Sequence, residues 1–297
     1  MENGIYTNLT AQLDKLHRHT RQGSYQTRER YLEAMKRFCR FLADEYQLQK
    51  LSNLAPKHLH KYVEYLQDTD IAASTIKTDL AGIRFFHDQI PGPRHSLPDN
   101  SAFDLERRSY GKKDKTWSYQ EFAAMRQLAV DRDDYATALT LAYYAGMRVE
   151  ECFTIDTAMA EEALRKNAIT FHGKGGRWRT VPINEHIAGQ LQIMLTQVKR
   201  GQKLLTPEGV PVRDAISRFQ LFIINNRDKA EAPNRETHMT AHGLRHSYAC
   251  NTYRELRAQG FTHEKTCKWV SVLLGHDRPD IVRTYLVSVL RDGDAHV

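Results

Sequence analysis

The sequence predicts a mainly α-helical fold with one small antiparallel β-sheet, divided between two domains. Apolar residues recur at spacings of three and four along much of the chain, which is typical of amphipathic helices. A glycine-rich turn at 173–176 separates two short strand-like segments and predicts a hairpin. The 297 residues are too many for one ordinary core, and the proline-rich stretch 91–100 offers a boundary. We therefore expect a helical domain over 1–105, a basic linker over 106–115 and a second domain over 116–297.

The first domain is expected to be a bundle of about four helices. A weaker helix is predicted over 8–20. Three stronger helices are predicted after it: the first follows a capping residue at Ser24 or Thr27, the second starts at Pro56, and the third follows Ser74. Their apolar positions are Leu32, Met35, Cys39, Leu42 and Tyr46; Leu59, Tyr62, Val63 and Leu66; and Ile76, Leu80, Ile83 and Ile90.

The second domain begins with a capping box, Ser118-x-x-Glu121, which predicts a helix. Another helix is expected to end at Gly146, because glycine commonly terminates helices. The hairpin should comprise strands at about 168–172 and 177–183. The remainder is expected to be helical.

Composition indicates a globular protein rather than a membrane or disulfide-rich one. Lysine and arginine number 43 against 36 acidic residues, so the net charge of +7 favours an anionic partner, nucleic acid above all. The four cysteines are far apart and show no metal-ligand spacing. No apolar signal core or membrane-length stretch is present, and we expect a reducing cytoplasm as the compartment.

Two local patterns could bear on chemistry, although each is weak by itself. Arg148 follows the helix-ending glycine, and Glu151 lies three positions later, a spacing that alone predicts an ion pair within a helix. Lys174 is at the tip of the hairpin, where a lysine is usually just exposed to solvent.

Three further patterns lie towards the C-terminus. His242 and Arg245 are one helical turn apart, and the neighbouring His246 is expected to face away from them. Gly275 should end a helix and expose His276. Tyr285 lies in an apolar stripe, where a tyrosine is normally half-buried with its hydroxyl at the edge.

Taken in order, these patterns resemble the tyrosine recombinase (phage integrase) family. The stretches AGMRVEE, GKGGRWRTVPI, HGLRHSYA and LLGHDRPDIVRTYL are similar to its signature boxes. The resemblance covers residues 115–290 clearly and 24–90 more loosely. It implies a SAM-like helical core-binding domain followed by a catalytic domain. It also implies a site-specific recombinase that cleaves and rejoins duplex DNA through a 3′-phosphotyrosyl intermediate.

The resemblance assigns a role to each candidate residue. Tyr285 would be the nucleophile, and Arg148 and Arg245 would hold the scissile phosphate. His242 and His276 would complete the site, with Lys174 as general acid and Glu151 as a supporting residue. The residues expected to contact DNA are Arg107, Arg108, Lys112, Lys113, Lys115, Lys77 and Arg84.

The resemblance also implies partners. They are a double-stranded recombination site, three further copies of the chain in a tetramer on paired sites, and accessory DNA-bending or directionality proteins. No cofactor, metal or membrane is expected. The short tail after Tyr285 contains Leu286, Val287, Val289 and Leu290, which could dock on a neighbouring protomer.

These assignments are chemically coherent. A free phenol has a pKa of about 10, so a tyrosine nucleophile needs help to lose its proton, and a histidine can provide it. Two guanidiniums can stabilise the charge that gathers on the attacked phosphate. Two alternatives stay open: a type IB topoisomerase, and a catalytically silent DNA-binding regulator with the same fold.

Overall fold

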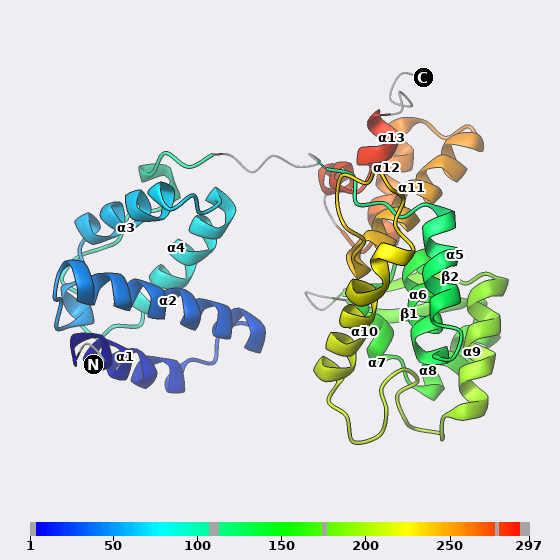
Figure 1. Cartoon of the computed structure of the whole chain (residues 1–297), viewed down its shortest axis with the longest axis horizontal. Coiled ribbons are helices and arrows are strands. Elements are labelled where there is room, and N and C mark those ends of the chain that lie inside the picture. The colour runs from blue at the N-terminus through cyan, green and yellow to red at the C-terminus, as the bar shows by residue number, and fades with distance from the viewer. Residues whose placement is uncertain (1–3, 107–112, 174–176, 277–278, 292–297) are drawn as a thin grey trace. The chain divides into compact units, whose positions relative to one another are not determined.

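The computed structural model of the 297-residue chain contains two compact units, residues 1–109 and 110–297 (Figure 1). The structure describes all residues except 1–3, 107–112, 174–176, 277–278 and 292–297. The linker expected over 106–115 falls largely among the residues that are not described, so its bounds stay a prediction. The predicted fold class, mainly helical with one small antiparallel sheet, is confirmed.

The first unit is a four-helix bundle with two short 3-10 turns. Its helices are α1 (Gly4–His19), α2 (Tyr25–Glu45), α3 (Pro56–Asp68) and α4 (Ala73–His87), and the turns are Leu51–Asn53 and Asn100–Ala102. Ser24 caps α2, because its side chain accepts a hydrogen bond from the amide of Thr27. Pro56 begins α3 as expected. The first helix is longer than predicted, and α4 begins one residue before Ser74.

Helices α2 and α4 pack closely and form the centre of this bundle. A Cβ added at Gly82 would lie 3.0 Å from the Tyr31 Cα, so only a glycine allows this approach of the two backbones. Beside it, the buried carboxylate of Asp79 accepts a 2.7 Å hydrogen bond from the Arg37 guanidinium. This ion pair satisfies a charge that would otherwise be costly to bury.

The second unit is mainly helical and contains a two-stranded sheet. Its elements are α5 (Tyr119–Leu128), α6 (Asp133–Ala145), α7 (Val149–Thr154), α8 (Thr157–Lys166), β1 (Ala168–Gly173), β2 (Arg177–Pro182), α9 (Glu185–Gln197), α10 (Val212–Asn226), α11 (Ala241–Ala258), α12 (His263–Leu273) and α13 (Val287–Arg291), with 3-10 turns at Arg227–Lys229 and Pro279–Thr284. The strands pair antiparallel, from Ala168 opposite Pro182 to Gly173 opposite Arg177.

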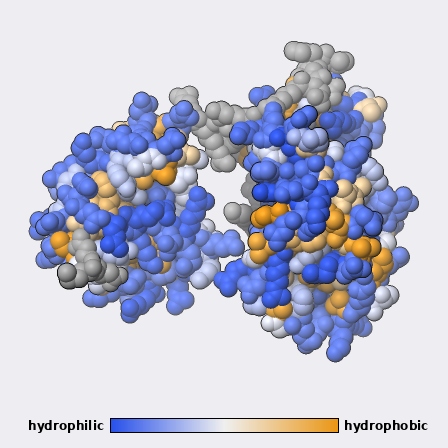
Figure 2. Space-filling view, viewed as in Figure 1, coloured by the Kyte–Doolittle hydropathy of each residue, from blue (hydrophilic) through white to orange (hydrophobic). Residues whose placement is uncertain are grey.

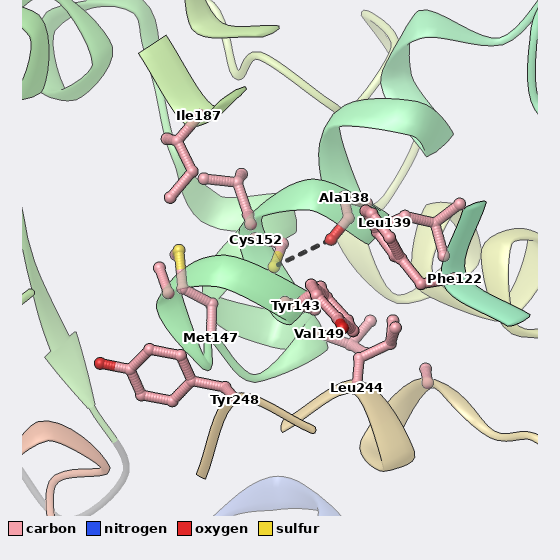
Figure 3. Packing of buried hydrophobic residues seen from close by; sticks show 14 of the residues in the cluster. Phe122, Ala138, Leu139, Tyr143, Met147, Val149, Cys152, Ile187, Leu244 and Tyr248 are labelled. Carbon is pink, nitrogen blue, oxygen red and sulfur yellow. Dashed lines mark hydrogen bonds between the residues drawn. The ribbon is translucent and has the colours of Figure 1, made fainter. Parts of the chain in front are cut away.

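Helix α6 is the centre of the second core. Its neighbours include α5, α9 and α11, and almost every one of its side chains is buried. Figure 3 shows Tyr143 of α6 beside Phe122 of α5; the two rings stack with centroids 4.1 Å apart. On another side of the helix, the Cys152 thiol lies 3.9 Å from the Ala138 carbonyl oxygen. This core gives the residues at the end of α6 a rigid support.

The end of α6 has the glycine that the sequence predicts. Gly146 has φ 59° and ψ 29°, the left-handed conformation that a side chain disfavours. A Cβ here would lie 2.2 Å from Cδ1 of the Tyr248 ring. The chain can therefore turn sharply from α6 into α7 while remaining in contact with α11.

The described helices include no candidate membrane-spanning segment. No described helix is both long and apolar enough to cross a bilayer. The space-filling view shows a mostly hydrophilic face, with apolar patches on both units (Figure 2). Leu286, Val287 and Val289, considered above for docking on a neighbour, are instead buried within their own unit, where α13 packs against α11.

Replacing Gly146 with alanine should destabilise the second unit. The added Cβ enters a disfavoured backbone region and overlaps the Tyr248 ring, so we expect Gly146→Ala to lower the free energy of unfolding by about 2–4 kcal/mol. Gly189→Ala in the middle of α9 is the matched control. A Cβ at Gly189 would have no atom within 4 Å, so this change should raise stability by up to about 1 kcal/mol. Urea denaturation measures both. Equal effects of the two changes would contradict this explanation of the turn.

Candidate active site

The first basic group of the site is held at the start of α7. Arg148 is the residue that caps this helix, and its backbone amide donates a 2.7 Å hydrogen bond to Oε2 of Glu151. Its Nη1 donates to the other carboxylate oxygen, also at 2.7 Å. The ion pair expected from their spacing is therefore present. Glu151 is buried, whereas the Arg148 side chain remains 21% exposed.

The second basic group is almost completely buried. Arg245 lies on α11 with only 1% of its surface exposed, and its guanidinium donates hydrogen bonds to the carbonyl oxygens of Gly146 and Leu274. Burial, followed by the nearby Arg179 and Arg148 charges, lowers the pKa of Arg245 to about 10. It therefore stays protonated at neutral pH.

The candidate nucleophile lies in the same place. Tyr285 follows the last 3-10 turn, and its ring centroid is 5.8 Å from the Arg245 Cζ. Its hydroxyl is 3.3 Å from Nε2 of His276, within hydrogen-bonding reach. Its carbonyl oxygen accepts a 3.2 Å hydrogen bond from the Cys250 thiol on α11. The backbone is thus fastened to α11 while the phenol projects towards basic groups.

Histidines surround the Tyr285 ring, and one of them was misplaced by the sequence analysis. The His242 centroid is 5.8 Å from that of Tyr285, and the His246 centroid is closer, at 4.6 Å. His246 was expected to face away from His242, but their rings are only 5.2 Å apart. The prediction was wrong because residues four apart lie on the same side of a helix.

The three imidazoles of the site are neutral at physiological pH. Burial and then the charges of Arg245, Arg148 and Arg179 lower the pKa of His276 to about 4. His242 lies at the protein surface, yet desolvation by surrounding protein atoms and the charge of Arg245 lower its pKa to about 4. Burial lowers the pKa of His246 to about 3. A neutral imidazole can accept a proton.

Arg179 of β2, which the sequence patterns did not single out, is buried among these residues. Its Nη2 donates to Oε2 of Glu151 at 2.6 Å and to the Gly146 carbonyl oxygen at 3.2 Å, and its Nη1 donates to the Leu273 carbonyl oxygen at 2.5 Å. Its cross-strand partner Phe171 is also buried. The sequence signal that could have identified Arg179 is an arginine at an inward-facing position of a predicted strand.

Family comparison agrees with this geometry. The phage integrase family model matches residues 120–289, more than half of the chain, and the model for the phage integrase N-terminal region matches residues 6–90. The chain belongs to the phage integrase family.

Individual relatives are distant in sequence but similar in fold. A tyrosine recombinase XerC of Pediococcus pentosaceus is 25% identical over 292 residues, covering 89% of this chain and 88% of the relative. A lambda integrase (75–356) dimer bound to a COC′ core site has a TM-score of 0.68 at 15% identity, with 94% and 95% coverage. The XerH recombinase in a post-cleavage complex with difH has a TM-score of 0.65 at 17% identity, with 97% and 84% coverage. At these identities the structures show the shared fold.

The residues expected to contact DNA have differing surroundings. Lys113 and Lys115 are exposed at the start of the second unit. Lys77 donates a 2.6 Å hydrogen bond to the Glu106 carbonyl oxygen, and Arg84 donates to Pro98 and Asn100, so both also support the end of their own unit. Arg107, Arg108, Lys112 and the candidate general acid Lys174 lie outside the described residues.

Metal-binding side chains do not gather in the described part of the chain. Among these residues, no group of three or more histidine, cysteine or acidic side chains is arranged to hold a metal ion. All four cysteines are unpaired and buried.

The buried histidine beside Tyr285 should make stability depend on pH. Because the folded-state pKa of His246 is about 3, below its ordinary value near 6.5, the unfolded chain binds the extra proton first as pH falls. Stability should decline from about pH 6.5 downward, by on the order of a few kcal/mol from this group. In His246→Gln this part of the decline should disappear. Urea denaturation between pH 8 and 4 tests it; parallel wild-type and variant curves would contradict it.

Proposed function

We propose that this protein is a site-specific DNA recombinase that cleaves and rejoins duplex DNA through a 3′-phosphotyrosyl intermediate. The observation that carries the proposal is the convergence on one place of the Tyr285 phenol, a neutral His276 within hydrogen-bonding reach, and the Arg148 and Arg245 guanidiniums. Family membership and the Xer relatives support the same activity.

In the cleavage step, the Tyr285 oxygen attacks phosphorus and forms a new phosphodiester while the bond to the 5′ oxygen breaks. The phenolic proton goes to Nε2 of His276, which is 3.3 Å from the Tyr285 hydroxyl. The pKa of His276 is about 4 here, because burial and three arginine charges disfavour its protonation. A bound phosphate brings negative charge beside the imidazole, and this raises the pKa towards the range a general base requires.

The two arginines stabilise the negative charge that builds up on the attacked phosphate. Arg148 is partly exposed and can meet a phosphate directly. Arg245 is almost completely buried beside Tyr285, so a phosphate reaches it only when neighbouring side chains shift. Each preorganised contact of this kind contributes about 3 kcal/mol to rate.

Rejoining reverses the same chemistry. During cleavage, Lys174 donates a proton to the leaving 5′ oxygen as general acid. During rejoining, a 5′-hydroxyl of another strand gives its proton back to Lys174 and attacks the phosphotyrosine, and the released Tyr285 oxygen regains its proton from His276. Since one phosphodiester replaces another, no ATP is consumed. His242 lines the site beside the phenol, and Glu151 orients Arg148.

The substrate is a double-stranded recombination site bound through its phosphates. Lys113, Lys115, Lys77 and Arg84 supply positive charge together with Arg107, Arg108 and Lys112, and binding should weaken steeply with salt. Four protomers would act on two paired sites; a lambda integrase tetramer bound to a Holliday junction has been solved. We place the activity on DNA in the cytoplasm, at the nucleoid, with accessory DNA-bending or directionality proteins.

Removing the phenolic oxygen should abolish covalent chemistry and spare binding. A nicked half-site duplex incubated with the wild type in EDTA should trap a protein–DNA adduct that survives SDS and disappears on protease treatment. Tyr285→Phe should form none, because it has no oxygen nucleophile, yet it should shift the duplex in a gel with an unchanged Kd. An adduct formed by the phenylalanine variant would show that Tyr285 is not the nucleophile.

Removing the exposed guanidinium should separate catalysis from binding. Arg148→Ala should lower the single-turnover cleavage rate by about 10²–10³-fold, the usual cost of losing one preorganised donor to a transition state. Duplex affinity should fall by less than about tenfold, because many other basic groups contact the backbone. Arg126→Ala, on α5, is the matched surface control. Equal losses of rate and affinity in Arg148→Ala would mean that this arginine merely anchors DNA.

A further inference from the structure

Arg179 occupies the centre of a charge cluster at the candidate active site. Its side chain is only 5% exposed. Its guanidinium donates to the Glu151 carboxylate, which also binds Arg148, and to the Gly146 carbonyl oxygen, which also binds Arg245. Among the described residues, the Glu151 carboxylate pairs with Arg148 and Arg179, and the charges of both arginines also act on Arg245. The cluster therefore carries more positive than negative charge, which suits an anion in the transition state.

The contacts of Arg179 differ from those of an ordinary structural ion pair. The Glu151 carboxylate accepts from both guanidiniums: Nη1 of Arg148 donates to Oε1 at 2.7 Å, and Nη2 of Arg179 donates to Oε2 at 2.6 Å. Oε2 also accepts the 2.7 Å hydrogen bond from the Arg148 backbone amide. The carboxylate charge is thus shared between two cations. Without Arg179, it would be directed at Arg148 alone, and the pair would offer a phosphate much less net positive charge.

Arg179 and Arg245 also join the same two helix ends. Both donate to the Gly146 carbonyl oxygen at the end of α6, and they take the consecutive carbonyls of Leu273 and Leu274 at the end of α12. A positive charge is favourable at a helix C-terminus. Gly275 follows directly, and a Cβ there would lie 2.9 Å from Cδ of Arg179, so the fold keeps this space for the arginine.

We propose that Arg179 is a positioning residue for the recombination reaction. By sharing the Glu151 carboxylate, it leaves positive charge on Arg148 for the scissile phosphate, and by bracing the ends of α6 and α12, it holds Arg245 in the same site. The inference rests on the proposed function, since it assigns Arg148 and Arg245 to the phosphate. Arg179 itself is buried and acts through these neighbours.

A charge-compensation experiment tests this role. Arg179→Met preserves bulk and leaves Glu151 bound to Arg148, so the variant should fold, bind the duplex, and cleave at least about tenfold more slowly in single turnover. Adding Glu151→Gln removes the competing charge and keeps a residue suited to the capping box. The double variant should therefore cleave faster than Arg179→Met. A double variant that is no faster, or an Arg179→Met rate equal to wild type, would overturn the proposal.

Arg235 provides a matched structural control. It is also a mostly buried arginine, with a 2.6 Å ion pair to Glu121, but it holds the segment before α5 rather than the cluster. Arg235→Met should lower the melting temperature without slowing cleavage at equal duplex occupancy. Adding Glu121→Gln to it should bring no gain in rate. If Arg235→Met slowed cleavage as much as Arg179→Met, the effect of Arg179 would be one of stability alone, and the proposal would fail.

A second readout needs no DNA chemistry. Orthovanadate resembles the five-coordinate phosphate, and we expect it to raise the melting temperature of the wild type and of Arg235→Met. The rise should be smaller in Arg179→Met and should recover in the double variant with Glu151→Gln. The same rise in wild type and Arg179→Met would overturn the role of Arg179. Failure of the wild type to form the DNA adduct would instead contradict the proposed function, and the vanadate comparison would still decide this inference.

Discussion

The carbonyl oxygen of Gly146 accepts hydrogen bonds from two buried guanidiniums, Arg179 and Arg245, and the geometry of the site depends on this shared acceptor. The oxygen is available because α6 ends in a left-handed glycine, which leaves the last carbonyls of the helix without partners in the helix itself. The same turn places Arg148 at the start of α7. The left-handed conformation of Gly146, which requires a residue without a Cβ, therefore helps to position the guanidiniums of Arg148, Arg179 and Arg245.

Burying these cations would be unfavourable in an apolar core, and the fold offsets the cost in several ways. Helix ends supply carbonyl oxygens with partial negative charge, and Glu151 supplies a full one. The compensation is incomplete: burial and the neighbouring guanidiniums lower the pKa of Arg245 to about 10. The remaining positive potential is the property that a phosphodiester would use. Stability and anion recognition thus depend on the same groups.

Burial, together with this potential, lowers the pKa of each histidine around Tyr285. A field that disfavours protonation keeps the imidazoles neutral until an anion arrives, since burial and arginine charges lower the pKa of His276 to about 4. In the proposed reaction, binding of DNA and activation of the phenol would be coupled electrostatically. The hydrogen bond from the Cys250 thiol to the Tyr285 carbonyl oxygen positions the Tyr285 backbone against α11. The Tyr285 ring lies next to the buried Arg245 guanidinium.

The sequence by itself determined the elements with strong local signals: the helices with regular apolar spacing, the hairpin around its glycine-rich turn, and the stop at Gly146. It also determined the ordered motifs that carry Arg148, Arg245, His276 and Tyr285, because each is a local pattern. Only the tertiary structure decided which groups meet. Arg179 was overlooked because its partners lie on α7 and at the ends of α6 and α12, more than 25 residues away along the chain. Long-range burial and shared hydrogen-bond acceptors leave little trace in local spacing, so packing alone reveals them.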